Sequence, residues 1–431
     1  MNTSFKQKPP RVVIVGGGFG GLAVARALRN APVEVVLIDR TNHHLFQPLL
    51  YQTATSILSP SQIATPIRQI LGHQDNASVF MAELAGIDTA KRRVLVDYLN
   101  KKAVPFSYDY LVLATGASHN YFGHEEFADY APGLKKLTDA TSIRDRILRA
   151  FEVAEEVDDP KEHRDVLTFV LVGGGPTGVE LAGSIAELRR FTLASEFRRM
   201  NPDDARILLI EGSPRILGSF HESLSRAAQR RLEALGVEVR TGVHVTKIDA
   251  TGVMIGNEHI ASRTVIWTAG VKPSPAAQWL GASADKAGRV MVQPDCSVPG
   301  CEEVFVIGDT ALFMEDGKPL PGVAQVALQQ GKYVASVIAA RVEGYRTPGP
   351  FRYFDKGNMA VVGRNFAVLE VGHIRLAGFI AWLAWALVHI LFLAAFGNRL
   401  LVVTQWIWSY ISSQRGSRLI MGEGGKSPLV G

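Results

Sequence analysis

Two glycine-rich segments with one shared pattern constrain the fold of this 431-residue chain more than any other feature. Residues 16–21 (GGGFGG) and residues 173–178 (GGGPTG) both fit G-x-G-x-x-G. Each segment follows an apolar run typical of a buried strand, residues 11–16 and 165–173, and precedes a predicted helix. In such a loop the first glycine permits a tight turn, the second lets the backbone approach a pyrophosphate, and the third lets the helix pack on the strand. The sequence therefore predicts two dinucleotide-binding folds in an α/β protein.

An acidic residue ends the strand that follows each glycine loop. Asp39 lies 18 residues past Gly21, and Glu211 is its counterpart after the second loop. A carboxylate at this place accepts hydrogen bonds from ribose hydroxyls and repels a 2′-phosphate, which favours NADH over NADPH. The alternative, two ordinary glycine turns with surface acids, leaves unexplained why one plan recurs 157 residues along the chain.

A late strand, residues 304–307, ends in Gly308-Asp309, and this resembles the flavoproteins that have two dinucleotide-binding domains. The turns at residues 114–116 (ATG) and 268–270 (TAG) are similar to those of the same family. The resemblance implies that the first fold binds FAD through two separated segments and that the second, NADH-binding fold is inserted between them. It also implies contact between Asp309 and the flavin ribityl chain. A helix N-cap is the alternative role for Asp309 alone.

Three further segments resemble the type II NADH dehydrogenases, which are single-subunit, non-pumping NADH:quinone oxidoreductases. They are residues 43–52 (HHLFQPLLYQ), 175–180 (GPTGVE) and 324–329 (AQVALQ). The resemblance implies hydride transfer from NADH to FAD, followed by two-electron transfer to ubiquinone or menaquinone. It gives Glu180 a catalytic role in orienting nicotinamide or relaying protons. Gln325 and Gln329 lie four residues apart, on one helix face, and are expected to bind the quinone carbonyls.

Residue by residue, the resemblance implies separate contacts to each cofactor. Those to FAD are Gly16, Gly17, Gly18, Phe19, Gly20, Asp39, Arg40, Leu84, Ala114, Thr115, Gly116, Asp309, Ala324 and Gln325, and those to NADH are Gly173, Gly175, Gly178 and Glu211. The domains expected are an FAD-binding domain in two parts (1–125 and 271–345), an NADH-binding domain (126–270) and a membrane-attachment domain (346–431). No metal site is expected, because the adjacent His43 and His44 lack further ligands at metal-binding spacing.

The two cysteines, Cys296 and Cys301, have the C-x₄-C spacing of several disulfide reductases but lie far from the first glycine loop. In disulfide reductases and sulfide:quinone oxidoreductases the redox cysteines lie beside the flavin. We therefore expect Cys296 and Cys301 to be ordinary buried or loop cysteines without a redox role.

The C-terminal part contains an apolar stretch, residues 376–396, whose length suffices to cross a bilayer as a helix. A second apolar stretch, residues 400–411, is too short. We expect monotopic attachment, with a single span and a buried dimer interface as the alternatives. Interfacial anchors are expected among Trp382, Trp385, Trp406, Trp408 and Tyr410, and lipid phosphates are expected to meet Arg375, Arg399, Arg415 and Arg418.

Composition narrows the remaining function classes. The net charge is +5, but the basic residues are scattered, so nucleic acid is not an expected partner. No presequence is recognisable, which favours the cytoplasmic face of a bacterial membrane over the mitochondrial inner membrane. A homodimer is expected. The rival functions are a soluble NADH-dependent flavoprotein reductase and a redox-sensing signalling flavoprotein. The first does not account for the apolar tail, and the second requires NADH to reduce the flavin without quinone turnover.

Overall fold

The computed structural model describes residues 8–194, 196–394 and 396–422. The chain forms two compact units, each assembled from separate stretches of sequence. The first unit comprises residues 1–44, 65–118 and 271–355, and the second comprises residues 45–64, 119–270 and 356–431. Each unit contains one glycine loop and one main sheet of mostly parallel strands, so the predicted α/β class with two dinucleotide-binding folds is confirmed.

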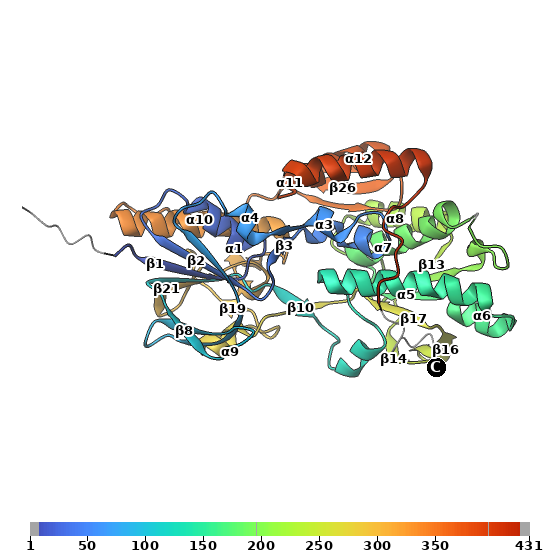
Figure 1. Ribbon diagram of the computed structural model, residues 1–431, viewed down its shortest axis with the longest axis horizontal. Helices are drawn as coiled ribbons and strands as arrows, with labels where there is room; N and C mark the ends of the chain where they lie inside the picture. Colours follow the sequence, from blue (N-terminus) through green and yellow to red (C-terminus); the bar gives the residue numbers. More distant parts are fainter. Residues whose placement is uncertain (1–7, 195, 395, 423–431) are drawn as a thin grey trace, which may run out of the picture. The chain divides into compact units, whose positions relative to one another are not determined.

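The first unit is built on a six-stranded sheet in the order β20-β21-β9-β1-β2-β5. Figure 1 labels β1, β2 and β21 of this sheet. Its strands are β1 (Arg11–Val15), β2 (Glu34–Asp39), β5 (Ala77–Met81), β9 (Tyr110–Leu113), β20 (Ser297–Val298) and β21 (Cys301–Val306). All neighbours are parallel except β20 and β21. Strand β21, which ends just before Gly308-Asp309, therefore joins the sheet that begins with the first glycine loop.

Both faces of this sheet are buried, which explains why its strands read as continuous apolar runs. Val12 and Ile14 point into one core, where α1 (Phe19–Ala27) packs against α10 (Ala324–Glu343). Val13 and Val15 point into the other core, which also contains residues of the antiparallel sheet β6 (Glu83–Asp88), β7 (Arg93–Asp97) and β8 (Val104–Ser107). The period of two places alternate residues of β1 in different cores.

The second unit repeats the plan with a four-stranded parallel sheet in the order β13-β12-β11-β17. These strands are β11 (Thr168–Val172), β12 (Arg206–Glu211), β13 (Val237–Thr241) and β17 (Thr264–Trp267). Two helices, α5 (Leu137–Glu156) and α6 (Pro160–Val166), lead into this sheet. The break between them has a local cause: Asp159 caps α6 by accepting a hydrogen bond from the Lys161 N–H, and Pro160 begins the new helix.

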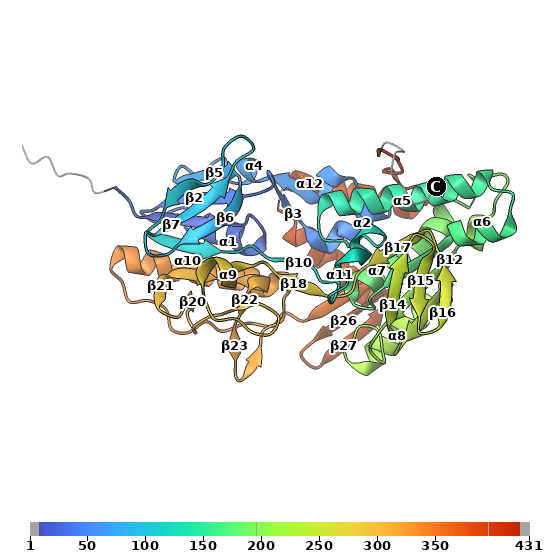
Figure 2. The same cartoon turned by 90° about the horizontal axis from the view of Figure 1, so that it is seen from below.

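The C-terminal part adds an antiparallel sheet and two helices to the second unit. The strands are β25 (Asn358–Val361), β26 (Ala367–Val371) and β27 (Ile374–Gly378), and the helices are α11 (Phe379–Phe392) and α12 (Phe396–Ser412). Helix α7 (Pro176–Glu187) packs against β25, and α8 (Glu222–Ala234) packs against β26 and β27 (Figure 2). Helix α11 packs against the same small sheet. The C-terminal helices thus belong to the unit that carries the second glycine loop.

The apolar stretch 376–396 is not one helix. Residues 376–378 pair with β26 as the end of β27, and α11 contains only 14 residues. The apolar stretch therefore includes the last residues of a strand and the helix that follows it. Throughout the described ranges, every helix falls short of the length or apolarity needed to cross a bilayer.

Shorter elements complete the two units. They are β3 (His43–Leu45), α2 (Leu50–Ala54), α3 (Pro60–Ile63), β4 (Ala64–Pro66), α4 (Ile67–Ile70), β10 (Ala117–His119), β14 (Val245–Asp249), β15 (Gly252–Ile255), β16 (Glu258–Ala261), β18 (Val271–Pro273), α9 (Ala276–Leu280), β19 (Val290–Met291), β22 (Ala311–Leu312), β23 (Met314–Glu315) and β24 (Lys318–Pro319).

Candidate functional site

The glycine loop of the first unit has the geometry that a dinucleotide requires. Gly16 has a φ of +103°, and a Cβ there would lie 2.3 Å from the Ala114 carbonyl oxygen. A Cβ on Gly21 would lie 1.9 Å from the Gly16 carbonyl oxygen, so only glycine lets α1 approach β1. The Asp39 carboxylate accepts a hydrogen bond of 2.5 Å from the Gly17 N–H, which fixes this acid beside the loop.

The second unit repeats these features. Gly173 has a φ of +114°, and a Cβ on Gly178 would lie 1.9 Å from the Gly173 carbonyl oxygen. Glu211 accepts hydrogen bonds from the Gly174 N–H at 2.6 Å and from the Ser213 N–H at 2.7 Å. Both predicted acids therefore lie against their glycine loops.

The middle glycine of each loop fits the space that a pyrophosphate needs. A Cβ built on Gly18 or on Gly175 meets no protein atom within 4 Å. These two glycines are the N-caps of α1 and α7, and neither helix has a side-chain cap. The positive end of each helix dipole therefore faces space that an anion can occupy.

We expect Gly175→Ala to weaken NADH binding and leave the fold intact. The methyl group touches no protein atom but enters the space beside the helix start, so the KM for NADH should rise about 10-fold. Steady-state NADH oxidation and a thermal melt measure the two effects. Gly349→Ala is the matched control, because a Cβ there is equally free of contacts. An unchanged KM in Gly175→Ala would remove this glycine from the nucleotide site.

The late segment of the first unit meets the turn at residues 114–116. Thr310 Oγ1 donates to the Gly116 carbonyl at 2.9 Å, and Thr115 Oγ1 lies 2.5 Å from Ser274 Oγ. Gln330, a buried residue that the sequence did not single out, accepts a hydrogen bond of 2.8 Å from the Gly308 N–H. Asp309 follows at the start of a short 3₁₀ turn. The structure therefore brings Gly116 and Asp309 into one region of the unit, although 193 residues separate them.

Other predicted FAD contacts lie around the same loop. Phe19 contacts His44 edge to face at 5.2 Å, and His44 Nδ1 lies 3.0 Å from the Gly17 carbonyl oxygen. Burial lowers the pKa of His44, so the ring is neutral. Leu84 is buried in the unit and Arg40 is exposed. Within the described residues no group of His, Cys, Asp and Glu has the arrangement of a metal site.

The two predicted quinone ligands of α10 differ in their surroundings. Gln325 and Ala324 are half-buried in the first turn of the helix. The amide of Gln329 is engaged by the main chain of Phe354: it donates to the carbonyl at 2.9 Å and accepts from the N–H at 3.0 Å. These two bonds use the side-chain oxygen and one of the two N–H groups of Gln329, so one N–H of the amide is left for a quinone carbonyl.

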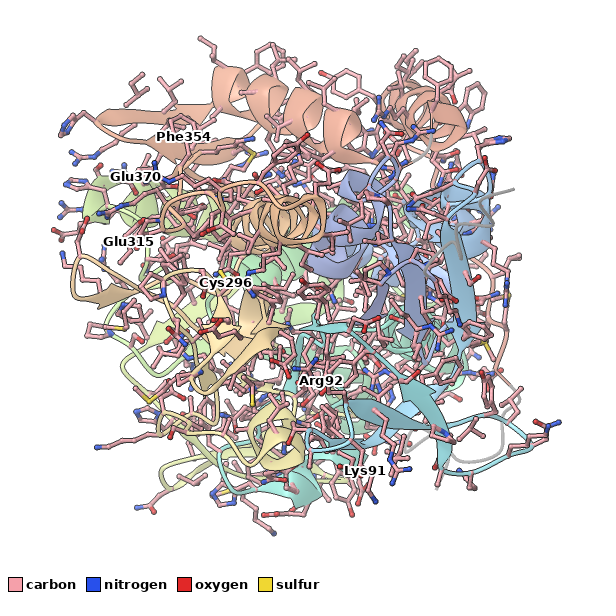
Figure 3. All side chains as sticks on the ribbon, turned by 90° about the vertical axis from the view of Figure 1, so that its left-hand side faces the viewer. Lys91, Arg92, Cys296, Glu315, Phe354 and Glu370 are labelled. Carbon is pink, nitrogen blue, oxygen red and sulfur yellow. The ribbon has the colours of Figure 1, made fainter. Side chains whose placement is uncertain are left out.

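Cys296 and Cys301 are free thiols in the first unit. Cys296 lies in the core behind the sheet (Figure 3), and burial raises its pKa. A reactive thiol needs the opposite shift. These properties match a structural cysteine.

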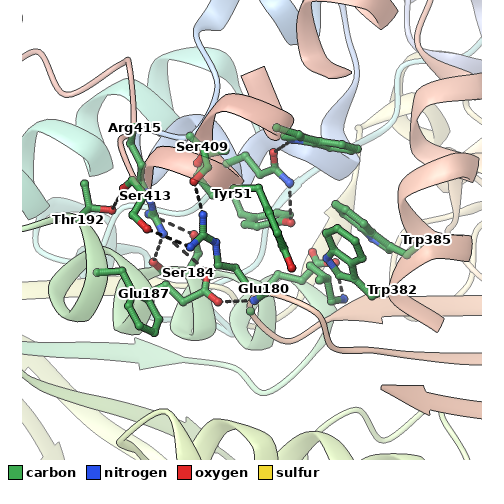
Figure 4. Close-up of a pocket in the computed structure, with 18 residues that line it drawn as sticks. Tyr51, Glu180, Ser184, Glu187, Thr192, Trp382, Trp385, Ser409, Ser413 and Arg415 are labelled. Carbon is green, nitrogen blue, oxygen red and sulfur yellow. Dashed lines mark hydrogen bonds and ion pairs between the residues drawn. The ribbon is translucent and has the colours of Figure 1, made fainter. Parts of the chain in front are cut away.

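A pocket in the second unit joins the start of α7 to the C-terminal helices (Figure 4). We call it the aromatic pocket. It holds about 700 Å³ of space including its open mouth, and its walls come from α2, α7, β25, α11, α12 and the segment after α12. The lining residues are Tyr51, Gln52, Ile57, Glu180, Ser184, Glu187, Phe191, Thr192, Val361, Gly363, Arg364, Trp382, Trp385, Trp406, Ser409, Tyr410, Ser413 and Arg415.

Glu180 lies on the α7 wall of this pocket, close to the second glycine loop. Burial raises the pKa of Glu180 to about 8, and a weak hydrogen bond of 3.4 Å from the Val361 N–H only partly opposes this rise. The carboxyl is therefore mostly protonated at pH 7. A carboxyl that holds a proton at neutral pH in an apolar pocket suits proton transfer.

The same face of α7 carries Ser184 and Glu187, four and seven residues after Glu180. Arg415 lies over this face, with Nη2 3.8 Å from a Glu187 oxygen and 3.1 Å from the Ser184 carbonyl oxygen. Burial raises the pKa of Glu187 and lowers that of Arg415 to about 10. For both groups, desolvation outweighs the attraction between them.

Three predicted lipid anchors have other roles. Trp385 is 2% exposed and stacks on Trp406 at 5.4 Å. Arg415, expected at lipid phosphates, is 5% exposed and pairs with Glu187. The predictions for Trp385 and Arg415 are wrong, and Trp406 is only partly exposed. The rings pack as pocket walls, and the guanidinium pairs inside the protein. Trp408 and Tyr410 remain exposed, by 61% and 48%.

The sequence did not identify Tyr51 or Gln52 as members of a site. Both lie in α2, a helix of five residues, and both are buried. The only available signal was their place at the end of the segment 43–52.

Taken together, the two glycine loops, their acids and the pocket at α7 define the class of oxidoreductases that use two dinucleotides.

Sequence comparison narrows this class. Residues 10–331 match the pyridine nucleotide-disulphide oxidoreductase family. The chain is 43% identical over 427 residues to the type II NADH:quinone oxidoreductase Ndh of Mycobacterium tuberculosis, covering 96% of this chain and 91% of that one. It is 31% identical over 410 residues to the demethylphylloquinone reductase NdbB of a Synechocystis species, covering 92% and 96%.

The fold is also similar to that of NDH2 from Plasmodium falciparum, solved in complex with NADH. The TM-score is 0.87 at 20% identity, over 96% of this chain and 100% of that one. The chain belongs to the type II NADH:quinone oxidoreductases, within the pyridine nucleotide-disulphide oxidoreductase family.

Proposed function

We propose that this protein is a non-electrogenic NADH:quinone oxidoreductase that works at a membrane surface. The observation that carries the proposal is the aromatic pocket, which places Glu180, next to the second glycine loop, and the tryptophans of α11 and α12 around one space. Relatives named for the same reaction cover nearly the whole chain. An apolar substrate that approaches from lipid needs such a space in the part of the protein that meets the membrane.

The cofactors are assigned by unit. The loop at residues 16–21, with Asp39, Arg40, Leu84, residues 114–116, Asp309, Ala324 and Gln325, holds FAD, and Gly173, Gly175, Gly178 and Glu211 hold NADH. The chemistry that bound FAD would supply is hydride acceptance from NADH and two-electron transfer to quinone. Gln325 and Gln329 of α10, in the first unit, stay quinone ligands implied by the family resemblance, and neither is among the described residues that line the aromatic pocket.

The chain itself supplies proton chemistry and orientation. Reduction of a quinone to a quinol consumes two electrons and two protons; the hydride of NADH brings both electrons and one proton, so one further proton is needed. Glu180 holds one proton in the aromatic pocket at neutral pH, because burial keeps its carboxyl from ionising. The aromatic walls exclude water around that carboxyl, which preserves its raised pKa.

One experiment tests the proposal: NADH oxidation by detergent-purified protein with and without a short-chain quinone. We expect the quinone to accelerate reoxidation of the NADH-reduced flavin. A soluble reductase would instead prefer a protein acceptor, and a redox sensor would show no quinone turnover. Reoxidation that quinone does not accelerate would refute the proposal.

Attachment to the membrane is proposed through an apolar row on α11 and α12. The row consists of exposed side chains at helical spacing: Ile380, Leu383, Leu387 and Leu391 on α11, and Phe396, Leu400, Ile407, Trp408 and Ile411 on α12. A contiguous apolar surface of this kind marks an interaction site rather than an ordinary exposed face. The proposed location is the cytoplasmic face of the bacterial cell membrane, and the proposed assembly is a homodimer.

We expect the double variant Leu383→Asp/Leu387→Asp to lose membrane binding. The two side chains are 48% and 59% exposed, so the fold loses little when they change. Each buried leucine contributes about 1.5–3 kcal/mol to partitioning, which predicts at least a 100-fold weaker association. Flotation with phosphatidylglycerol-containing vesicles measures it. Leu99→Asp, at a side chain 90% exposed in the first unit, is the control and should float like the unmodified protein. Equal flotation of the double variant would contradict the assignment.

A further inference from the structure

Tyr51 ends a chain of three hydrogen-bonded side chains in the aromatic pocket. The Trp406 Nε1–H donates to the Gln52 side-chain oxygen at 2.8 Å. The Gln52 amide nitrogen donates to the Tyr51 hydroxyl oxygen, also at 2.8 Å. Tyr51 and Gln52 are 5% and 4% exposed, so both side chains are largely enclosed by protein.

The chemistry of Trp406 determines which group donates and which accepts in each of these hydrogen bonds. An indole nitrogen is a donor only, so the Gln52 atom that faces Trp406 must be the oxygen. The amide nitrogen must then face Tyr51, where it can only donate. The Tyr51 oxygen therefore accepts, and its own O–H has to donate to another group.

Nothing in the described part of the chain accepts that O–H within hydrogen-bonding distance. The Tyr51 side chain lines the aromatic pocket together with Glu180, and the two groups are close enough to interact electrostatically (Figure 4). Buried donors are normally satisfied, so an unused one that lines a pocket indicates an acceptor on the ligand.

We propose that the Tyr51 hydroxyl donates a hydrogen bond to a carbonyl oxygen of the quinone bound in the aromatic pocket. This inference rests on the proposed function. As electrons reach the quinone, negative charge develops on its oxygens, and a donor already oriented toward one of them stabilises that charge. Tyr51 keeps its proton throughout, because burial and the nearby Glu180 raise its pKa well above 10. Glu180 is the group that gives up a proton, and Tyr51 positions the oxygen.

The hydrogen bonds from Trp406 through Gln52 to Tyr51 also link the aromatic pocket to the apolar row. Trp406 belongs to α12, the helix whose exposed residues Leu400, Ile407 and Trp408 belong to that row. If α12 moved away from α2, the Gln52 amide could rotate and present its oxygen to Tyr51. The hydroxyl would then donate to Gln52 and be lost to the substrate. Trp406 is therefore a positioning residue for Tyr51.

The test measures the two half-reactions of the full-length holoenzyme separately by anaerobic stopped flow. Tyr51→Phe removes only the hydroxyl, and we expect a roughly 10-fold slower reoxidation of reduced flavin by a short-chain ubiquinone. Flavin reduction by NADH and reoxidation by ferricyanide, which has no carbonyl group, should stay within about twofold of the unmodified rates. Tyr345→Phe, at a side chain 70% exposed in the first unit, is the matched control.

Trp406→Phe should slow quinone reoxidation about threefold, because the released Gln52 amide captures the hydroxyl only part of the time. The double variant Tyr51→Phe/Trp406→Phe should be no slower than Tyr51→Phe alone, since both changes act through one hydrogen bond. Additive losses, equal losses with ferricyanide, or an unchanged quinone rate in Tyr51→Phe would each overturn the role of Tyr51. If quinone fails to reoxidise even the unmodified enzyme, the proposed function fails together with this inference.

Discussion

Glu180→Gln should lower the rate of quinol formation about 100-fold and remove its dependence on pH near 8. The expected magnitude is that of a lost general acid. Burial raises the pKa of Glu180 to about 8, so the carboxyl carries a proton at pH 7 and loses it as the pH rises through 8. Quinol formation by the unmodified protein should therefore decline above that pH, whereas glutamine has no proton to lose there.

The measurement is quinone reduction by pre-reduced protein from about pH 6 to about pH 9.5. The matched control is Glu222→Gln, which changes an exposed glutamate at the start of α8. Its pH profile should coincide with that of the unmodified protein. A Glu180→Gln variant that retained the decline near pH 8 would show that another group supplies the proton.

The raised pKa of Glu180 also makes the stability of the folded protein depend on pH. The folded protein retains the Glu180 proton between the ordinary carboxyl value of 4.5 and about 8, whereas the unfolded chain has released it. Folding therefore binds a proton in this window, and the contribution of Glu180 to stability is lost as the pH rises through it. The thermal midpoint of Glu180→Gln, relative to the unmodified protein, should be higher at pH 8 than at pH 5.

The parts of the site that sequence could predict are those set by short local patterns. The glycine loops, Asp39 and Glu211 were predictable because a strand, a turn and a helix within one βαβ unit position them. The place of Glu180 at the start of α7 followed from the same pattern. The cofactor and quinone assignments of individual residues stay predictions, as does the division of the chain into four domains.

The aromatic pocket could not be predicted because its members come from distant segments. Gln52 and Trp406 are 354 positions apart, and hydropathy describes Trp385 and Trp408 in the same way. Tertiary packing makes the difference: Trp385 is buried on α11, which packs on the small sheet, whereas Trp408 is exposed on α12. Arg415 was similarly ambiguous: a cation beside an apolar helix suits lipid phosphates, and its pairing with Glu187 depends on tertiary structure.

Arg415→Met should lower the free energy of unfolding by about 3–5 kcal/mol, the typical cost of removing one partner from a buried ion pair. The Arg415 guanidinium donates to the Thr55 carbonyl at 2.7 Å and to the Ser184 carbonyl at 3.1 Å, and it pairs with Glu187. It thereby connects the segment after α12 to α2 and α7. Methionine fills part of the space but removes the cation that pairs with Glu187 and the side-chain donor to the Thr55 carbonyl.

A melt of the detergent-purified protein should show a midpoint lower by roughly 6–12 °C. Arg352→Met removes an ion pair of 3.0 Å whose partners are 70% and 82% exposed, and such pairs contribute at most about 1 kcal/mol. That control should melt within about 2 °C of the unmodified protein. If Arg415→Met matched the control, Arg415 would not anchor the C-terminal segment.

Adding Glu187→Gln to Arg415→Met should recover part of the lost stability. Glutamine still accepts the hydrogen bond that the Arg364 N–H donates to Glu187, but it carries no charge to desolvate. In Arg415→Met alone, the pKa of Glu187 should rise further because the Arg415 cation no longer lowers it. Glu187 is then more readily neutralised by protonation, so Arg415→Met should lose less stability at pH 5 than at pH 8. The double variant has no carboxylate at this position and should lose similar amounts of stability at both pH values. This pH dependence separates a missing countercharge from a packing defect, because a cavity left by arginine would destabilise the protein equally at either pH.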